Sequence, residues 1–338
     1  MKAYQFTQFN GPEGLTLTDL PEPTAGPGQV LIRVRAVSLN YRDLRVARGQ
    51  YAGKLPAGLT PLSDGAGEVV AVGAGVSRVK TGDRVAGIFF QTWLDGGIKA
   101  AYHASALGGA VDGMLAEYVA LSEEGVVKLP DYLTYEEAAT LPCAAVTAWD
   151  GLVEQGHLAA GETVLLLGTG GVSVFALQIA KMHGARVIIT SSSDEKLERA
   201  KALGADAGIN YKTTPDWDRA VWALMGKAGV DHVVEVGGAG TLEKSLKSTR
   251  YGGHVALTGV LTGLAPQISP LDILWKSLRV SGIYVGSRAM FERLLSALAV
   301  SETRPIIDRV FGFDEARAAY EYMETGQRFG KVVIRVAD

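Results

Sequence analysis

The 338-residue chain is poor in the residue types on which several classes of protein depend. Its one cysteine, Cys143, excludes an internal disulfide and a structural zinc site of three or four thiolates. The five histidines, at positions 103, 157, 183, 232 and 254, include no i,i+4 pair. No apolar run reaches the roughly 18 residues of a membrane helix, so no membrane partner is expected. The formal charge of −3 comes without basic clusters, so no nucleic-acid partner is expected either. A single thiol is typical of a reducing compartment, which favours the cytoplasm.

Length and composition indicate a globular protein of more than one domain. At roughly 150 residues per domain the chain has room for about two domains, each with its own core. The hydrophobic fraction of 47% and the charged fraction of 20% argue against intrinsic disorder. In the first 130 residues, glycine and proline break short β-type runs at 30–37, 67–72, 84–90 and 112–119. Short strands separated by turn residues predict a compact β-rich unit.

A different pattern begins near Thr134. Thr134 and Glu137 fit a capping box for a helix through Ala139, with Pro142 interrupting or restarting it. From Thr163 onward, candidate strands alternate with helices. The strands are expected at 164–167, 186–190, 207–210, 232–236, 254–258 and 279–284, and a final helix and strand at 314–325 and 331–336. The predicted fold class is therefore α/β, a β-rich domain plus a doubly wound parallel sheet.

A glycine-rich turn joins the first of these strands to its helix. Gly168, Gly170 and Gly171, followed by Val172, stand directly between the two elements. A strand-to-helix turn without side chains lets a pyrophosphate reach the backbone N–H groups at the helix N-terminus. The alternative is a turn kept only for close packing. The third glycine of the usual fingerprint is Ser173 here, so we expect slightly wider packing rather than lost binding.

The end of the second strand indicates which dinucleotide is preferred. An NAD site normally presents an acid there to the adenosine ribose, whereas this chain has Ser191 and Ser192, with Lys196 a turn later. Hydroxyls and an ammonium suit a 2′-phosphate, so NADP(H) is the predicted cofactor. Asp194 is interpreted as an acid in the first turn of the next helix, where negative charge is favoured. Tyr211 is predicted to close over the same phosphate. The alternatives are a solvated helix lysine for Lys196 and a packing aromatic for Tyr211.

Four ordered motifs are spread along the chain: Asn40-Tyr41-Arg42-Asp43, the segment from Gly65 to Gly73, Gly82-Asp83-Arg84-Val85 and Phe329 to Val333. Together they resemble the medium-chain dehydrogenase/reductase superfamily over essentially the whole chain. The resemblance implies a GroES-like catalytic domain, expected at 1–126 and 288–338, and a Rossmann domain at 127–287. It also implies an active site in the cleft between these domains. Similar proteins commonly dimerise through the edge of the Rossmann sheet, so a homodimer is expected.

Within this superfamily the presence or absence of zinc ligands distinguishes the zinc alcohol dehydrogenases from the zinc-free reductases. The catalytic zinc of the alcohol dehydrogenases needs a Cys where this chain has Tyr41 or a neighbour, and a His-Glu pair where it has Ser63-Asp64. Of the three ligand positions only Cys143 is kept, and one thiolate cannot form a three-ligand site. The four cysteines of the structural zinc are also missing. The resemblance therefore favours the zinc-independent, quinone oxidoreductase-like branch, with no metal site.

Without zinc, the protein has to orient the reactants and supply a hydrogen-bond donor to the developing oxyanion. The resemblance points to Asn40, Arg42 and Tyr51, which lie in the loop that faces the nicotinamide in similar enzymes. Tyr51 is the favoured proton donor. The alternative is a loop aromatic that packs over Leu55 and Pro56. Asp43 is expected to be structural, pairing with a nearby arginine or capping the next short helix.

Further cofactor contacts are expected at the carboxyl ends of the later strands, where ligands bind in open α/β sheets. These are Gly237, Gly259, Val260, Leu261, Val285, Gly286 and Ser287. The resemblance adds Thr147 under the nicotinamide, and Arg328 and Lys331 near the cofactor. For both basic residues the alternative is a solvated surface charge.

The leading functional prediction is a zinc-independent, NADPH-dependent reductase of quinones or α,β-unsaturated carbonyls, acting on a small molecule. Two alternatives stay open: a metal-free alcohol or aldehyde oxidoreductase, and a nucleotide-binding sensor or structural protein with little turnover. The aromatic-rich stretch around Phe90, Trp93 and Tyr102 is expected to line the substrate pocket or a subunit contact.

Overall fold

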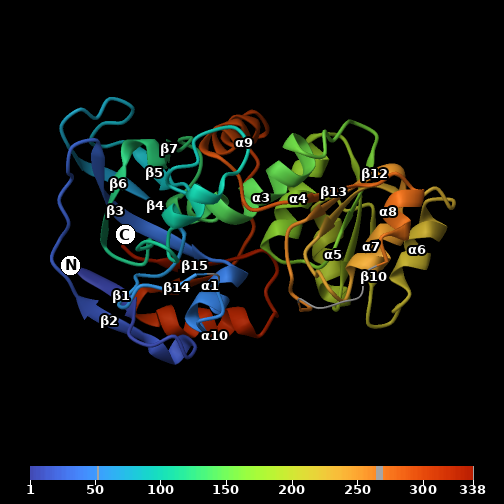
Figure 1. Ribbon diagram of the computed structural model, residues 1–338, viewed down its shortest axis with the longest axis horizontal. Coiled ribbons are helices and arrows are strands. Elements are labelled where there is room, and N and C mark those ends of the chain that lie inside the picture. Colours follow the sequence, from blue (N-terminus) through green and yellow to red (C-terminus); the bar gives the residue numbers. More distant parts are fainter. Residues whose placement is uncertain (52, 264–268, 338) are drawn as a thin grey trace. The chain divides into compact units, whose positions relative to one another are not determined.

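A computed structural model describes residues 1–51, 53–263 and 269–337. The chain forms two compact units (Figure 1): unit 1 comprises Met1–Val146 and Val285–Asp338, and unit 2 comprises Thr147–Tyr284. The predicted α/β fold class is confirmed, because unit 1 is β-rich and unit 2 contains an all-parallel sheet. Among the described helices, none has both the length and the apolar character needed to cross a bilayer.

Unit 1 is built on a seven-stranded sheet in the order β14-β15-β3-β4-β5-β7, with β6 pairing with β3 and a separate β1–β2 ribbon. The strands are β1 (Lys2–Phe6), β2 (Leu15–Asp19), β3 (Gln29–Leu39), β4 (Asp64–Val72), β5 (Arg84–Gly87), β6 (Tyr118–Ser122), β7 (Val126–Lys128), β14 (Ile307–Gly312) and β15 (Lys331–Arg335). The helices are α1 (Tyr41–Ala47), α2 (Tyr135–Ala139), α9 (Arg288–Ser301) and α10 (Ala316–Glu324). The long strand β3 is rich in Val and Ile and is paired on both edges, as expected of a central strand.

One predicted strand of unit 1 is wrong. The segment 112–119 becomes β6 only from Tyr118 onward. Before that, Gly113 donates its N–H to the carbonyl of Thr60 at 2.7 Å, and Met114 donates to Leu62 at 2.8 Å. The start of this segment therefore pairs with an irregular stretch, and only at Leu115 and Glu117 does its backbone bond to the strands β1 and β3. At Gly113 a Cβ would lie 2.1 Å from the carbonyl oxygen of Leu62, so the close approach requires glycine.

Unit 2 is a six-stranded parallel sheet covered by helices (Figure 1), in the order β10-β9-β8-β11-β12-β13. All six predicted strands are present: β8 (Thr163–Leu166), β9 (Arg186–Ser191), β10 (Ala207–Asn210), β11 (Val230–Glu235), β12 (Thr249–Leu257) and β13 (Arg279–Gly282). The helices are α4 (Gly171–Met182), α5 (Asp194–Ala202), α6 (Trp217–Leu224), α7 (Leu242–Ser248) and α8 (Leu271–Trp275), and α3 (Val146–Trp149) begins at the unit boundary. The strand order reverses between β8 and β11, and such a switch point is where open α/β sheets bind ligands.

The observed units divide the chain later than the domain boundary expected at 126/127. The segment 127–146 packs with unit 1, because α2 lies against β3 and β4. The predicted capping box is confirmed, since Thr134 Oγ1 accepts from the N–H of Glu137 at 3.1 Å and Glu137 bonds back. Pro142 lies in a π-helical turn after α2 has ended. Residues 285–287, expected in the Rossmann domain, belong to unit 1 as well. The family domain limits themselves stay a prediction.

Candidate functional site

The glycine-rich turn of unit 2 forms an open cradle at the end of β8. Gly168 has φ of 72°, and a Cβ built on it would meet nothing within 4 Å, so the space above the backbone is empty. Its N–H donates to Thr190 Oγ1 at 3.1 Å. Helix α4 starts at Gly171, and its N-cap, Gly170, brings no side chain to occupy the first N–H groups. The turn therefore fits a dinucleotide pyrophosphate.

Ser173, in the place of the third fingerprint glycine, adds a contact. Its hydroxyl is buried and donates to the carbonyl of Leu167 at 2.7 Å. This bond ties the first turn of α4 to the end of β8. The serine is accommodated by a hydrogen bond that glycine would lack.

The residues predicted for the adenosine end lie together beside this turn. Ser191 is buried at the end of β9, with its hydroxyl 3.4 Å from Thr169 Oγ1. Tyr211, which is 41% exposed, donates its N–H to the carbonyl of Ser191 at 3.0 Å. Ser192, directly after β9, and Lys196, in the first turn of α5, are both half-buried. The β8 turn, the β9 end and the residue after β10 thus form one continuous surface.

Asp194 lies at the start of a helix, as predicted. It is the first residue of α5, and its Oδ1 accepts from Asn210 Nδ2 at 2.8 Å. The helix is capped by Ser193, whose hydroxyl accepts from the N–H of Lys196. The carboxylate is therefore fixed at the helix start, where an acid is favoured.

The turns after β11 and β12 contact each other at the switch point. A Cβ on Gly238 would lie 2.9 Å from the Cα of Val260, and Leu261 donates its N–H to the carbonyl of Val236. The predicted residues Gly237, Gly259, Val260 and Leu261 are thereby brought together. Sequence reasoning missed Glu235, a fully buried acid at the end of β11 that binds this turn. Its signal was an acid closing an apolar strand, followed by the hydroxyl donors Thr241 and Ser245.

In unit 1, Lys331 is the centre of a buried polar cluster. Its side-chain nitrogen donates to the carbonyl of Leu39 at 2.8 Å and to Asn40 Oδ1 at 2.6 Å, and it lies 3.7 Å from Asp64 Oδ2. Lys331 is 2% exposed, so the surface-charge alternative is wrong for it. Burial lowers the pKa of Lys331 and raises the pKa of Asp64, while each charge opposes the shift of the other.

Asp43 has the structural role expected. Its Oδ2 accepts from the backbone N–H of Asn40 at 2.7 Å at the start of α1, and its Oδ1 accepts from Arg42 at 3.1 Å. Burial raises the pKa of Asp43 to about 6, although Arg42 acts in the opposite direction. The two side chains hold the first turn of α1 in place.

Arg42 and Tyr51 are in contact. The guanidinium donates to the carbonyls of Leu107 and Gly108, both at 2.9 Å, and its Cζ lies 4.5 Å from the centre of the Tyr51 ring. Burial opposes the charge on Arg42, but Asp43 and Tyr51 raise its pKa. Tyr51 is half-buried and also packs against the core of unit 1. Arg42 is thus anchored by the backbone, and it holds the ring of Tyr51. The catalytic roles of Asn40, Arg42 and Tyr51 stay predictions.

The chain positions that correspond to a catalytic zinc site do meet in unit 1. The backbone N–H of Cys143 lies 3.3 Å from Asp64 Oδ2, and Asn40 joins the two through Lys331. The donor set, however, is one thiol whose pKa is raised by burial, one carboxylate and an ammonium between the segments. A resident cation disfavours a second one. Over the described ranges, no group of three His, Cys, Asp or Glu side chains is arranged to hold a metal ion. These residues do not fit a three-ligand zinc site.

Residues 285–287 are held in an unusual conformation at the start of α9. Val285 has φ of 63°, a left-handed value that a β-branched residue rarely adopts. A Cβ on Gly286 would lie 2.7 Å from Val146 Cγ1, so glycine is required there. Ser287 caps α9 by accepting from the N–H of Met290. Strained backbone of this kind persists where its surroundings fix it, and it clusters at functional sites.

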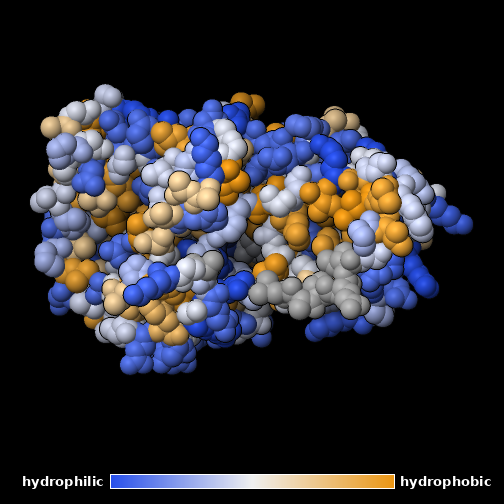
Figure 2. Space-filling model, in the orientation of Figure 1, coloured by the Kyte–Doolittle hydropathy of each residue, from blue (hydrophilic) through white to orange (hydrophobic). Residues whose placement is uncertain are grey.

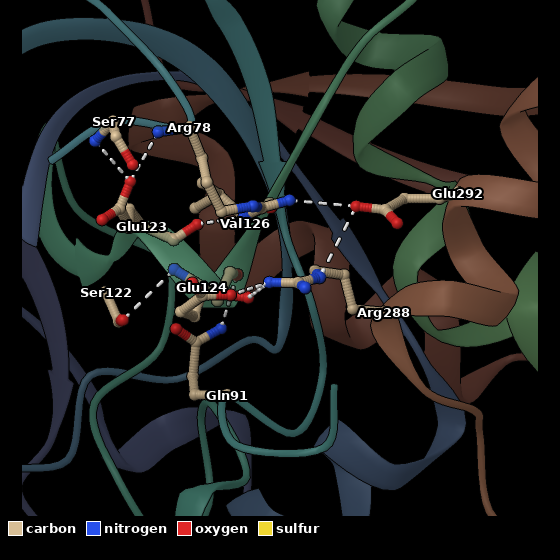
Figure 3. Close-up of polar contacts among 10 residues, drawn as sticks. Ser77, Arg78, Gln91, Ser122, Glu123, Glu124, Val126, Arg288 and Glu292 are labelled. Atoms are coloured by element: carbon tan, nitrogen blue, oxygen red, sulfur yellow. Dashed lines mark hydrogen bonds and ion pairs between the residues drawn. The ribbon is translucent and has the colours of Figure 1, made fainter. Parts of the chain in front are cut away.

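A network of charged side chains fixes the start of α9 (Figure 3). Arg288 bonds to Glu124 and lies 3.5 Å from Glu292, which in turn accepts from Arg78 at 3.0 Å. The carboxylate of Glu123 accepts the backbone N–H groups of Ser77 and Arg78 at 2.8 and 2.7 Å. The network ties α9 to the turn between β6 and β7. It therefore holds the strained segment 285–287 from its C-terminal side.

The remaining predicted residues are Thr147, Arg328 and the aromatic stretch around Trp93, whose carbonyl accepts from the N–H of Arg288 at the start of α9. Thr147 is buried in α3, and Arg328 is half-buried and donates to the carbonyl of Met323 at 2.9 Å. Burial lowers the pKa of Arg328. In the aromatic stretch, Trp93 stacks on Tyr102 at 5.9 Å, and Phe90 lies 6.0 Å from Trp93. Phe90 and Trp93 are buried, so these rings form a small local core.

Comparison with known proteins agrees with this architecture. A family model described as "Alcohol dehydrogenase GroES-like domain" matches residues 26–131, and one described as "Zinc-binding dehydrogenase" matches residues 171–300. A zinc-type alcohol dehydrogenase-like protein of Schizosaccharomyces pombe is 43% identical, covering 92% of this chain and 91% of that protein. A crystal structure from Sinorhizobium meliloti 1021, described as an alcohol dehydrogenase, has a TM-score of 0.93 and 43% identity over 99% of this chain and 98% of its own.

Other similar proteins have different stated activities. A 2-methylene-furan-3-one reductase of Solanum lycopersicum is 33% identical over 99% of this chain and 79% of its own length. A quinone oxidoreductase of Pongo abelii is 29% identical over 99% of this chain and 97% of its own. A mycobacterial protein solved in complex with NADPH has a TM-score of 0.83 and 28% identity over 99% and 100% of the two chains. An NAD-dependent alcohol dehydrogenase structure has a TM-score of 0.91 and 36% identity over 100% of both chains.

Proposed function

The chain belongs to the medium-chain dehydrogenase/reductase superfamily, and from that premise we propose that it is a zinc-independent, NADPH-dependent reductase of quinones or α,β-unsaturated carbonyls. The observation that carries the proposal is the buried ammonium of Lys331, bonded to Asn40 and 3.7 Å from Asp64. These positions correspond to two of the three zinc-ligand segments of the alcohol dehydrogenases. An enzyme with a lysine there needs a substrate that accepts hydride without a Lewis acid.

The cofactor side of the proposal uses residues of unit 2. When bound, the nicotinamide supplies the hydride. The open turn at Gly168 and the N-terminus of α4 would hold the pyrophosphate. Ser191, Ser192, Lys196 and Tyr211 would surround a 2′-phosphate. Similar structures include both an NAD-dependent enzyme and an NADPH complex, so the choice rests on these side chains. They are hydroxyls and a cation, which suits phosphate.

Tyr51 is the proposed proton donor. A reduced enone or quinone develops negative charge on oxygen, and a phenol can donate a hydrogen bond and then a proton to it. The Arg42 guanidinium over the ring stabilises the negative charge left on the phenol oxygen. Arg42 is thus a positioning residue, with its own place fixed by the carbonyls of Leu107 and Gly108. The amide of Asn40, fixed by Lys331, is a second proposed contact to substrate.

The substrate class is supported by two relatives. One is named for a methylene group conjugated to a ketone, and the other for quinones. Both acceptors disperse the arriving charge onto oxygen through conjugation. A metal-free alcohol or aldehyde oxidoreductase is the second candidate, favoured by the alcohol dehydrogenase names of other relatives.

We also propose a homodimer formed along β13. This strand pairs only with β12 in the described sheet, which leaves its other edge open. Val280 on β13, Tyr251, Leu274 and Trp275 are exposed apolar side chains of unit 2. Figure 2 shows apolar residues gathered on the face that carries α8. An open edge next to exposed apolar side chains favours pairing with a second copy. A cytoplasmic location also stays a prediction.

A panel of acceptors tests the activity. Purified protein is mixed with NADPH and with quinones, enones or simple aldehydes, and the absorbance of the reduced cofactor is followed. We expect turnover of quinones or enones, unaffected by a strong chelator, with far less than one zinc per chain by metal analysis. Turnover of aldehydes alone would favour the second candidate. Tight NADPH binding without turnover of any acceptor would favour a sensor. One zinc per chain would overturn the metal-free assignment.

A further inference from the structure

A buried carboxylate, Glu235, joins the two turns at the switch point of unit 2. Its Oε1 accepts from the N–H of Gly237 at 2.6 Å, the N–H of Gly238 at 2.9 Å and the hydroxyl of Thr241 at 2.7 Å. Its Oε2 accepts from the hydroxyl of Ser245. All four donors are neutral, and Glu235 is fully buried. Such a carboxylate is stabilised by its donors, and it orders them in return.

The carbonyls of the same turn are also occupied. Gly237 O accepts from both the N–H and the hydroxyl of Thr262, at 2.8 and 2.9 Å. Gly238 O accepts from the N–H groups of Thr241 and Leu242, at 3.1 and 2.9 Å. Both backbone groups of both glycines are therefore used inside the protein. These two glycines offer a ligand only their bare Cα surface.

The turn after β12 is fastened to this arrangement from two sides. Thr262 belongs to that turn, and its hydroxyl also accepts from the N–H of Gly240 at 2.7 Å. Near the strand ends, the N–H of Thr258 donates to the carbonyl of Glu235 at 2.8 Å. Neither glycine can carry a side chain, since a Cβ on Gly237 would lie 2.2 Å from Thr241 Oγ1 and Gly238 has φ of 81°. The turns after β11 and β12 are thus joined by hydrogen bonds into one continuous surface, called here the wall, with Glu235 buried beneath it.

We propose that Glu235 is a positioning residue for the nicotinamide half of the cofactor, holding the β11 and β12 turns as a single wall that recognises its ligand by shape. The inference rests on the proposed function, because it needs a dinucleotide at the switch point. In a doubly wound sheet each half of the dinucleotide lies on one half of the sheet. The β8 turn and the β9 end take the adenosine half, so the β11 and β12 turns face the other half. Glu235 acts on one half of the ligand only.

This prediction is tested by comparing a whole ligand with its adenosine fragment. Dissociation constants for NADPH and for adenosine 2′,5′-bisphosphate are measured by calorimetry on wild type and on Glu235→Met, which keeps the volume but removes the acceptors. We expect the Kd for NADPH to rise about tenfold or more, because two buried N–H groups lose their partner. The Kd for the fragment is expected to stay within about twofold.

Further variants separate positioning from folding. Glu235→Gln keeps an acceptor at Oε1, while its amide can donate to Ser245, so its Kd for NADPH is expected within about threefold of wild type. Thr241→Val, which removes one donor without touching the carboxylate, should weaken NADPH but not the fragment, whereas Thr241→Ser should weaken neither. Glu243→Gln, at an exposed acid on α7, is the matched control for lost charge.

Each outcome has one meaning. Equal weakening of NADPH and fragment in Glu235→Met and Thr241→Val would show a merely structural role and overturn the inference. Unchanged binding of both ligands would overturn it too. If wild type prefers NADH, the same comparison with ADP applies. Wild-type protein that bound no dinucleotide would overturn the proposed function itself, and that result is distinguishable because it needs no variant.

Discussion

The side-chain nitrogen of Lys331 lies 3.7 Å from Oδ2 of Asp64 inside unit 1, and only 3% and 0% of these two side chains is exposed. The two residues come from β15 and β4, in the two separate stretches of sequence that form unit 1. Both charges are buried away from water, so each is stabilised mainly by the opposite charge of its partner.

Lys331→Met is expected to lower the free energy of unfolding by about 3 kcal/mol, because it leaves a buried carboxylate without its cation. Urea denaturation monitored by circular dichroism measures the change. The double variant Lys331→Met/Asp64→Asn is expected to lose clearly less than the sum of the two single losses, since it removes the charge pair as a whole. A single variant within about 0.5 kcal/mol of wild type would show that the pair contributes nothing to folding.

The burial of Lys331 could not be read from the sequence. The strand 331–336 was predicted, but nothing in its local sequence tells a buried lysine at its first position from a solvated one. Its partners, Leu39 and Asn40, lie 292 and 291 residues away in the chain. Glu235 was missed for a similar reason, because its four donors become visible only when the turn after β11 has folded around it.

The parallel sheet, by contrast, was predictable strand by strand. Its strands are short apolar runs between turn residues, and that pattern is local. The glycine turn and the Thr134 capping box are local as well. The helix α9 was not expected. The strand predicted over 112–117 does not form, since the N–H groups of Gly113 and Met114 bond to the irregular residues Thr60 and Leu62. The structure places predicted cofactor residues of unit 2 around Gly168 and around Gly237, whereas Val285, Gly286, Ser287, Arg328 and Lys331 lie in unit 1. The contacts within each group could not be given by the sequence.

Lys196→Ala is expected to raise the Kd for NADPH about tenfold and to leave the Kd for NADH within about twofold, because only NADPH has a phosphate for the ammonium to meet. Fluorescence titration of each nucleotide measures both values. Lys201→Ala on the same helix, where the lysine pairs with Glu198 at the surface, is the matched control and should change neither. Equal losses for the two cofactors in Lys196→Ala would contradict the 2′-phosphate assignment.

Tyr51→Phe is expected to lower kcat about a hundredfold while KM changes by no more than about twofold, since a general acid contributes to the chemical step rather than to binding. Steady-state rates with the best acceptor of the panel measure the effect. Tyr135→Phe is the matched control, because this half-buried tyrosine of unit 1 also has an arginine over its ring, with Arg84 Cζ 4.6 Å from the ring centre. It should keep the wild-type rate. If Tyr51→Phe kept the full kcat, the hydroxyl would not be the proton donor, and the ring would serve only to pack against Arg42.

His254 is expected to make the stability of unit 2 depend on pH. Burial, together with the charges of His232, Arg279 and His157, lowers the pKa of His254 from 6.5 to about 4. Between these values the unfolded chain binds a proton that the folded chain does not, so stability falls as the pH drops from 6.5 to about 4. Since one pKa unit corresponds to about 1.4 kcal/mol, the loss is on the order of 3 kcal/mol. Urea midpoints measured across that range should fall steeply for wild type and less steeply for His254→Gln, whereas His103→Gln, at an exposed histidine, should follow wild type. If the wild-type and His254→Gln midpoints fell in parallel, His254 would not be the group that titrates.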